Sequence, residues 1–194
     1  MRGGREAGVA AVEVAMLLPL FLGMIFMILE VGRAMYLWNT VQEVTRHAAR
    51  DATISDFSRP AVMDAVRQRA IFRGTPGPLF LGGGIDDTYV RIDYLWLNKN
   101  AGANDSHALV QVGTLPACPT RNVINCANNP YAATCVRFVR ARLCLPGDPD
   151  ACDPVPYTPL VPLLNSLFTI TLPTSDTVAP AESLGYLPGA PDCP

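Results

Sequence analysis

The longest hydrophobic stretch of the chain runs from Val9 to Leu29 and is interrupted only by Glu13. A helix of about 20 apolar residues is long enough to cross the hydrocarbon core of a bilayer. The stretch therefore predicts a transmembrane helix, and Pro19 predicts a mild kink because it removes one backbone hydrogen-bond donor. Glu13 is unexpected here. On insertion scales even an Asp in mid-bilayer costs about 2.5–3.5 kcal/mol, and intramembrane acids are usually functional.

Beyond this stretch, polar and apolar positions follow the period of an amphipathic helix. The apolar positions recur at steps of three and four residues, at Leu37, Val41, Val44, Ala48 and Ala52. No proline or glycine lies between residues 33 and 57, so we expect one helix from about Val9 to Ile54, within a segment bounded at residues 9–57. Its first half would be covered by lipid, and its second half would offer an apolar stripe to a folded domain.

The charges around the apolar stretch predict its orientation. Arg2 and Arg5 precede it, which by the positive-inside rule indicates a cytoplasmic N-terminus, and Arg33 just beyond it weakens the asymmetry slightly. A conventional cleaved signal peptide fits poorly, because its hydrophobic region would be about 7–15 residues long and would end at a small-x-small site. This stretch is longer and continues into Glu30 without such a site.

Residues 58–194 predict a small α+β domain outside the membrane. Ser58 as an N-cap, with Pro60 in the first turn, predicts a second helix over residues 60–72. β-branched and aromatic residues predict strands over residues 88–97, 107–115, 134–145 and 168–173, with a turn over 98–106. An antiparallel sheet of these strands would bury one face on the apolar stripe of the long helix.

All six cysteines lie downstream of the apolar stretch, at Cys118, Cys126, Cys135, Cys144, Cys152 and Cys193. An even number confined to this part favours disulfides in an oxidising compartment over buried free thiols. The spacing favours two local pairs, Cys118 with Cys126 and Cys144 with Cys152, which leaves Cys135 for Cys193. Fifteen pairings are possible, so this pairing is a hypothesis.

The composition and the short motifs do not indicate catalysis. A net charge of −2, with 16% charged residues, argues against nucleic-acid binding. The cysteines are too widely spaced for a zinc site, and Gly82–Gly84 lacks the residues that follow a phosphate-binding loop, which predicts a flexible turn. Arg137, Arg140 and Arg142 predict the solvated face of a strand rather than a phosphate-binding surface. We therefore expect no enzyme activity, no cofactor and no metal site.

Gly8 and Glu13 can be interpreted together. A short basic leader, a glycine and a glutamate five residues later in an apolar helix resemble the class III signal of type IV pilins and pseudopilins. In that family a prepilin peptidase cuts after the glycine, which implies a leader of residues 1–8 and a mature chain that begins at Val9. Cleavage creates an α-amine, mostly cationic at neutral pH, that would pair with Glu13 of a neighbouring helix.

The N-terminal third more specifically resembles the TadE-like minor pseudopilins of the tight-adherence (Tad/Flp) pilus system. The resemblance rests on AAVEVAMLLPLFLGMIFMILEVGRAMY over residues 10–36, with Glu30, Gly32 and Arg33 in its EVGRA motif, and on the late segment 155–185.

This resemblance implies a type IV pilin-like fold and a role in pilus assembly, adhesion, biofilm formation or secretion. Val14 stands where major Flp pilins carry an aromatic residue, which favours a minor component. The implied location is the bacterial inner membrane, with a periplasmic C-terminal domain and possible entry into the external pilus. The implied partners are prepilin peptidase, other pilins and pseudopilins, the inner-membrane Tad platform proteins and the membrane itself.

Two alternatives stay open at this point. The chain could be an uncleaved single-pass anchor whose outer domain binds a ligand or an envelope component, and a mature protein that starts at Met1 rather than Val9 would favour it. A secreted or anchored hydrolase would need a nucleophile and base pair that the sequence does not reveal.

Overall fold

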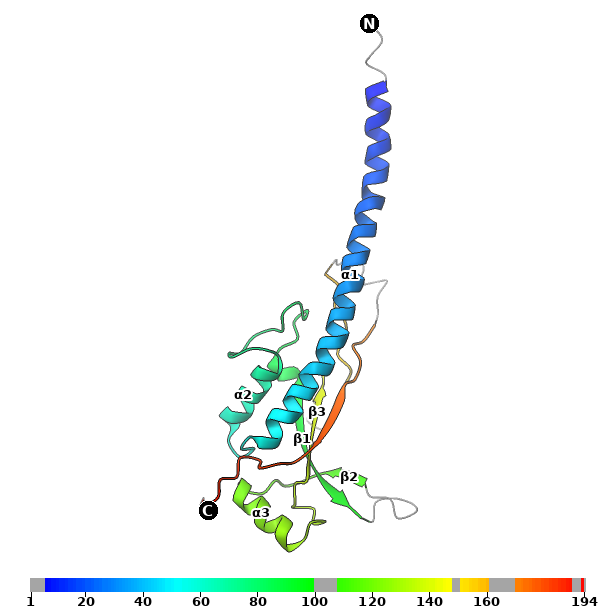
Figure 1. The fold of residues 1–194 in the computed structure, drawn as a ribbon. Helices are drawn as coiled ribbons and strands as arrows, with labels where there is room; N and C mark the ends of the chain where they lie inside the picture. Colours follow the sequence, from blue (N-terminus) through cyan, green and yellow to red (C-terminus); the bar gives the residue numbers. More distant parts are fainter. Residues whose placement is uncertain (1–5, 100–107, 148–150, 161–169, 190–192, 194) are drawn as a thin grey trace.

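The structure is a computed structural model that describes residues 6–99, 108–147, 151–160, 170–189 and 193. Its dominant element is helix α1, Glu6–Ile54, whose N-terminal half projects far from a small α+β domain (Figure 1). The expected single continuous helix is therefore confirmed. Pro19 lies inside α1 without ending it, and the kink there stays a prediction. Residues 1–5, with the two arginines of the predicted leader, lie outside the described residues.

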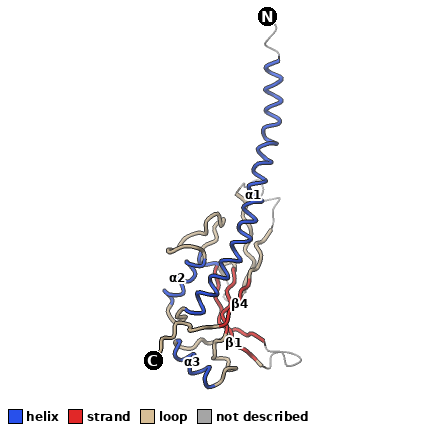
Figure 2. Tube along the Cα trace, in the orientation of Figure 1, coloured by secondary structure: helices blue, strands red, loops and turns tan. Residues whose placement is uncertain are grey.

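The second half of α1 forms the centre of the domain. All five residues of the predicted stripe are buried, at Leu37, Val41, Val44, Ala48 and Ala52. Helix α2, Pro60–Ala70, packs beside α1, and both lie next to the sheet (Figure 2). The predicted second helix is confirmed, although its N-cap is Arg59, because the Ser58 hydroxyl donates to Asp56 Oδ1 at 2.6 Å instead.

Within the described residues the sheet has four antiparallel strands in the order β2-β1-β3-β4. Their bounds are β1 Val90–Asn98, β2 Ala108–Gln111, β3 Phe138–Leu143 and β4 Asp176–Pro180. A 3-10 turn, η1 Asp87–Tyr89, precedes β1, and helix α3, Pro119–Asn128, connects β2 to β3. Val90, Ala141 and Leu143 of the sheet pack in one hydrophobic cluster with the stripe of α1. This arrangement confirms the predicted α+β class and the sheet packed on the helix.

The last strand differs from the prediction. The described part of the predicted strand 168–173 holds only an isolated bridge between Pro156 and Thr171, while residues 161–169 lie outside the described part of the chain. The edge strand is β4 instead. Its residues Asp-Thr-Val-Ala-Pro carry little β-strand signal, and the hydroxyl of Thr177 lies 3.0 Å from Thr45 Oγ1 on α1. Tertiary contacts with α1 and β3 therefore place this strand, and the local sequence does not predict it.

The structure pairs all six cysteines but corrects the predicted pairing. The pair Cys144–Cys152 is confirmed, whereas the pairs Cys118–Cys126 and Cys135–Cys193 are wrong. The disulfides are instead Cys118–Cys193 and Cys126–Cys135. The reason is α3, a helix that the sequence analysis did not predict. Cys118 caps this helix and Cys126 lies eight residues along it, so their Cα atoms are about 12 Å apart, beyond the reach of a disulfide.

The division into residues 1–8, 9–57 and 58–194 stays a prediction. Because α1 supplies a central part of the hydrophobic core, residues 58–194 do not contain all of that core.

Candidate functional site

The candidate site lies where the domain begins to cover α1. Glu30 follows sixteen uncharged residues of the helix, and Arg33 stands one turn later. Both side chains are buried, with Glu30 4% and Arg33 5% exposed, although their helix neighbours Leu29 and Val31 are exposed. We call Glu30, Arg33 and their partner Tyr157 the junction cluster, because it joins the projecting half of α1 to the domain.

Arg33 is held by two segments that are distant in the sequence. Its Nε donates to the carbonyl of Leu81 at 3.0 Å, and its Nη1 donates to the carbonyl of Thr158 at 2.7 Å. Nη1 also lies 3.4 Å from Glu30 Oε1 and 3.3 Å from the Tyr157 hydroxyl oxygen. One guanidinium thus connects α1 to the loop before β1 and to the segment before residue 160. Five rigidly arranged donors make Arg suited to such a role.

Glu30 accepts hydrogen bonds from the same side of the domain. The Tyr157 hydroxyl donates to Glu30 Oε1, and the backbone N–H of Leu160 donates to both carboxylate oxygens, at 3.3 and 3.2 Å. Burial, together with the hydrogen bond to Glu30, raises the pKa of Tyr157 to about 12. The Tyr157 hydroxyl therefore keeps its proton over the whole physiological range and acts as a donor to the carboxylate.

A tight loop closes over Arg33. Gly83 has a φ of +63°, and its carbonyl accepts a hydrogen bond from the Thr158 hydroxyl at 3.0 Å. A Cβ at this position would lie 2.7 Å from Arg33 Nη2 and would collide with Thr158 Oγ1. The glycines predicted as a flexible turn thus include one that a close approach requires, because only glycine takes this backbone conformation without strain.

The junction cluster fixes the position of the domain on the helix. A buried ion pair alone repays its desolvation poorly, but here further hydrogen bonds satisfy both partners. Among the described residues, no buried side-chain nitrogen or oxygen is without a hydrogen-bond partner. Because the partners of Glu30 and Arg33 come from segments 48 to 130 residues away, the cluster forms only when the whole domain is in place.

The residues predicted for processing and assembly lie elsewhere on α1. Gly8, Val9 and Glu13 are all exposed on the projecting half, and no atom lies within 4 Å of a Cβ placed at Gly8. Glu13 precedes Glu30 by seventeen residues, or about 25 Å of helix. Gly32, within the family motif, also faces open space. The structure thus brings Glu30 and Arg33 together and leaves the other sites separate.

A second charged cluster was not predicted. Asp93 is buried in β1 and accepts from Arg91, Arg140 and Arg142, with closest N–O distances of 3.2, 3.1 and 2.6 Å. Arg140 and Arg142 lie on the partly exposed face of β3, but both are ion-paired with this buried carboxylate, which the sequence did not predict. The antiparallel register pairs Asp93 with Arg140 and Arg91 with Arg142. That register is the signal that the sequence alone lacked.

Arg137 lies apart from this second cluster. Its guanidinium carbon is 6.0 Å from the Tyr131 ring centroid. Among the described residues, no three His, Cys, Asp or Glu side chains form a group that could hold a metal ion.

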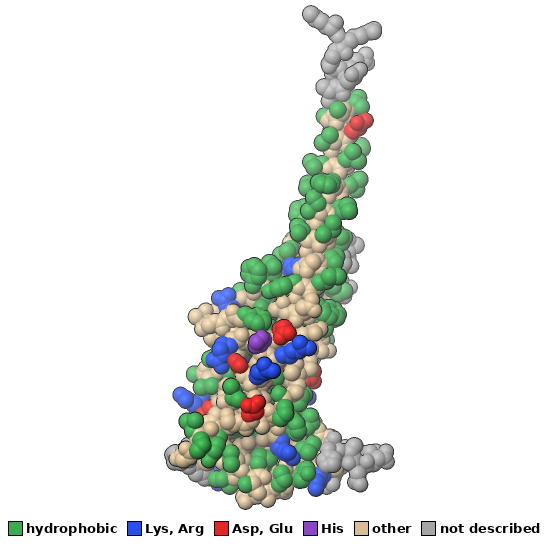
Figure 3. All heavy atoms as spheres, viewed as in Figure 1, with side chains coloured by type: hydrophobic (Ala, Val, Ile, Leu, Met, Phe, Trp, Pro, Cys, Tyr) green, Lys and Arg blue, Asp and Glu red, His purple; other side chains and the backbone are tan. Residues whose placement is uncertain are grey.

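Fold and site together define a class of protein in which one long helix carries a small disulfide-bonded α+β domain. The projecting half of this helix presents a mostly hydrophobic surface (Figure 3). Among the described residues α1 alone is long and apolar enough to cross a membrane, with a mean hydropathy of 2.4 over its most apolar window, none of which is buried.

Residues 8–50 match the model of the TadE-like protein family, which confirms the resemblance seen in the sequence. The match begins at Gly8 and includes Glu13, Glu30 and Arg33. It supports an association with the Tad pilus system. No curated protein and no solved structure matches the chain.

Proposed function

We propose that the protein is a minor pseudopilin of a Tad/Flp-type pilus, a structural component that acts in pilus biogenesis, adhesion and biofilm formation. The observation that carries this proposal is the family match over residues 8–50, because it covers the segment of α1 that includes the glycine and glutamate. The proposed location is the inner membrane, with the domain in the periplasm. The proposed partners are prepilin peptidase, other pilins and pseudopilins, and the Tad platform proteins.

The exposed half of α1 supports an assembly role. Its most apolar window makes no contact that buries it against the chain's own domain, so its surface is available first to lipid and then to other helices. In this proposal prepilin peptidase cuts between Gly8 and Val9. The new α-amine of one subunit then pairs with Glu13 of a neighbour. Such a pair offsets the cost of a carboxylate in an apolar environment and sets the axial register between helices.

The junction cluster supports a fixed position of the domain relative to the assembling helix. A subunit that is held in an assembly by its helix must present its domain in a fixed position. Glu30 and Arg33 bind two separate segments of the domain at the point where the covered half of α1 begins. We propose that this contact fixes the domain to α1, so that the axial position of each helix in the assembly also sets the position of its domain.

The test combines N-terminal sequencing of the mature protein with two substitutions, in cells with and without the prepilin peptidase. We expect a start at Val9 that depends on the peptidase, loss of processing in Gly8→Ser, and normal processing but impaired pilus assembly in Glu13→Ala. Glu43→Ala is the matched control, because Glu43 is an exposed acid on the same helix outside the apolar half. A mature start at Met1 would favour the uncleaved anchor, and normal assembly of Glu13→Ala would contradict the charge pairing.

A further inference from the structure

The exposed apolar surface of α1 extends beyond the predicted span. Large hydrophobic residues are exposed from Val9 through Leu29 and then at Val31, Met35, Tyr36 and Trp38. After Trp38, the next exposed large hydrophobic residue on α1 is Ile54, at its end. The thirty residues from Val9 to Trp38 form about 45 Å of helix. Counted from Val9 at the inner edge of the hydrocarbon core, this length exceeds the core of about 30 Å, so the exposed apolar surface continues past the core on the outer side.

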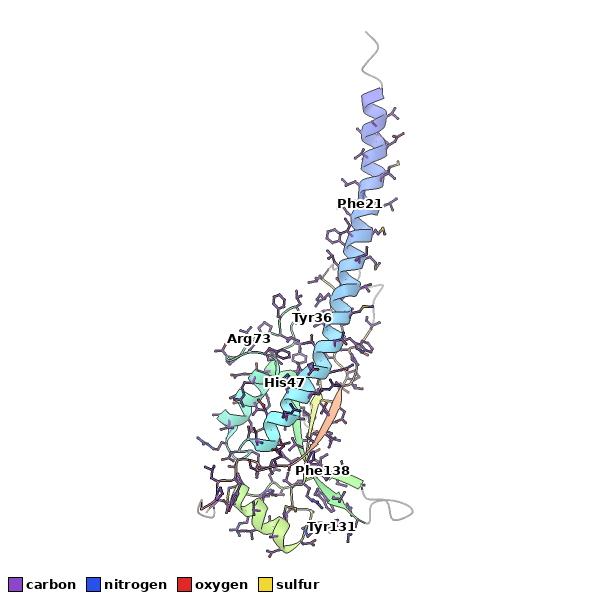
Figure 4. All side chains as sticks on the ribbon, viewed as in Figure 1. Phe21, Tyr36, His47, Arg73, Tyr131 and Phe138 are labelled. Carbon is purple, nitrogen blue, oxygen red and sulfur yellow. A yellow bond between two sulfur atoms is a disulfide. The ribbon has the colours of Figure 1, made fainter. Side chains whose placement is uncertain are left out.

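Trp38 and Tyr36 fit the outer end of this surface. Trp and Tyr side chains concentrate at membrane–water interfaces, where their rings lie at the level of the headgroups. Tyr36 lies at a similar height along α1 as the loop that carries Arg73, whereas Phe21 projects from the bare helix above (Figure 4). When Val9–Leu29 spans the hydrocarbon core, about 30 Å of helix, Glu30 and Arg33 follow within about 6 Å of its outer edge, in the outer interfacial layer and before Trp38.

Three exposed apolar residues of the domain, Phe80, Leu81 and Leu160, lie at the same level along α1; we call them the apolar tips. The carbonyl of Leu81 accepts a hydrogen bond from Arg33, and the N–H of Leu160 donates one to Glu30. The segments around Leu81 and Leu160 therefore lie beside α1 at the height of the junction cluster. Their side chains point outward, and Phe80, beside Leu81, is 74% exposed. The base of the first loop is fixed by a backbone hydrogen bond from Leu79 to Ile85, and both of these side chains are buried. The loop thus holds Phe80 and Leu81 outward instead of folding them into the core.

An apolar groove continues this surface on another face of α1. It has a volume of about 320 Å³ and is lined by Val31, Met35 and Trp38 of α1 with Tyr157 and Ile170 of the domain. Val31, Met35 and Trp38 are spaced four and three residues apart, so they share one side of the helix. Exposed apolar side chains therefore lie on more than one side of α1 at the level of the junction cluster.

We propose that the membrane-proximal end of the domain is seated in the outer interfacial layer of the lipid bilayer through Phe80, Leu81 and Leu160. This inference rests on the proposed membrane anchoring of α1. The apolar tips continue the exposed apolar surface of α1, and they flank the helix at a height where lipid already surrounds its exposed side. Lipid is therefore the partner that covers them. At that depth the domain satisfies Glu30 through Tyr157 and the N–H of Leu160, and Arg33 through the carbonyls of Leu81 and Thr158.

Single-tryptophan variants of the full chain in vesicles test this proposal. In a Trp38→Phe/Trp96→Phe background, one reporter is introduced by Phe80→Trp, and a second, independent one by Leu160→Trp. Leu22→Trp reports from within the apolar half. Leu187→Trp is the matched control, because Leu187 is 70% exposed but lies three residues from Leu184, which bonds to Thr53 in the last turn of α1. Circular dichroism checks that each variant is folded.

Two quenchers are applied to each variant: phospholipids brominated along their acyl chains, and acrylamide in the aqueous phase. We expect brominated lipid to quench Phe80→Trp and Leu160→Trp less than Leu22→Trp, which lies deeper, but clearly more than Leu187→Trp, and acrylamide to quench both less than it quenches Leu187→Trp. The proposal is overturned if both reporters behave like Leu187→Trp, or if they are shielded from both quenchers, which would indicate a protein neighbour. If Leu22→Trp itself is not quenched by lipid, membrane anchoring fails as well, so the two failures are distinguishable.

Discussion

Leu29 and Leu37 lie two turns apart on the same helix, yet the first is 60% exposed and the second 1% exposed. The residues before this boundary are apolar on every side of α1, whereas those after it are apolar on one side only. A helix that is hydrophobic all round needs an apolar environment around its whole circumference, and an amphipathic one needs a single partner surface. The first half of α1 therefore requires lipid or other helices around it, whereas the second half requires only the sheet of its own chain on one side.

The boundary between the halves is marked by charge as well as by burial. Glu30 and Arg33 form a buried pair three residues apart, and Glu43 and Arg46 repeat the same spacing at the surface. Both pairs have the same spacing on the same helix, so a difference in their contribution to the unfolding free energy reports the effect of burial. Three predictions test this comparison.

The largest effect is expected from Arg33→Ala. It leaves the Glu30 carboxylate buried without its cation, and breaking a buried pair in this way costs about 3–5 kcal/mol of unfolding free energy. The measurement is urea unfolding of the full chain in detergent micelles, followed by tryptophan fluorescence.

Arg46→Ala is the matched control for this substitution, because its pair has the same spacing and is exposed, and we expect it to cost about 0–1 kcal/mol. Adding Glu30→Gln to Arg33→Ala should recover part of the loss, since no unpaired carboxylate then remains. Equal costs for Arg33→Ala and Arg46→Ala would show that the junction cluster contributes no more than a surface pair.

The second prediction compares the two leucines directly. Leu37→Ala removes a fully buried side chain and leaves a cavity, so it should lower the unfolding free energy by about 2–5 kcal/mol. Leu29→Ala should change it by no more than about 0.5 kcal/mol, because Leu29 contributes nothing to the folded core. The same unfolding experiment measures both. A large cost for Leu29→Ala would mean that the projecting half packs on the domain in the isolated chain.

How far the sequence predicts each region follows from the range of the interactions that form it. The length of α1 and its buried stripe follow from local periodicity, and β1 and β3 follow from β-branched and aromatic residues, so these elements were predicted. In contrast, β4 depends on contacts with β3 and with Thr45 of α1. Likewise, the cysteine pairing depends on α3, whose polar sequence gives only the weak helix signal of Pro119 at its first position.

The candidate site shows the same limit. Glu30 and Arg33 were identified only through a family motif, and nothing in their local sequence indicates the partners that bury them. Leu81 is 48 residues away from Arg33, and Leu160 is 130 residues away from Glu30. A pattern with a period of three or four residues cannot encode contacts over such separations. Gly8 and Glu13, in contrast, lie on a surface that contacts no other part of the domain, so a single folded chain leaves their roles as predictions.

The smallest effect is expected from pH, and it is confined to alkaline conditions. Tyr157 has an ordinary pKa of 10.0 that burial and Glu30 raise to about 12 in the folded chain. Between these values the folded state keeps a proton that the unfolded state loses, so stability falls as the pH rises. Its contribution is fully present below pH 10 and is lost as the pH rises through about 12. Removing the group with Tyr157→Phe should therefore remove part of this alkaline loss.

The measurement is the difference in unfolding free energy between wild type and Tyr157→Phe, taken at a series of alkaline pH values. Tyr94 is also buried, and burial raises its pKa as well, but it is present in both proteins and cancels in the difference. At neutral pH the difference reports the lost hydrogen bond to Glu30, about 1.5–3 kcal/mol for a bond to a charged group. It should shrink steadily above pH 10. A difference that stays constant above pH 10 would mean that the Tyr157 hydroxyl does not donate to Glu30, and that Tyr157 is not part of the junction cluster.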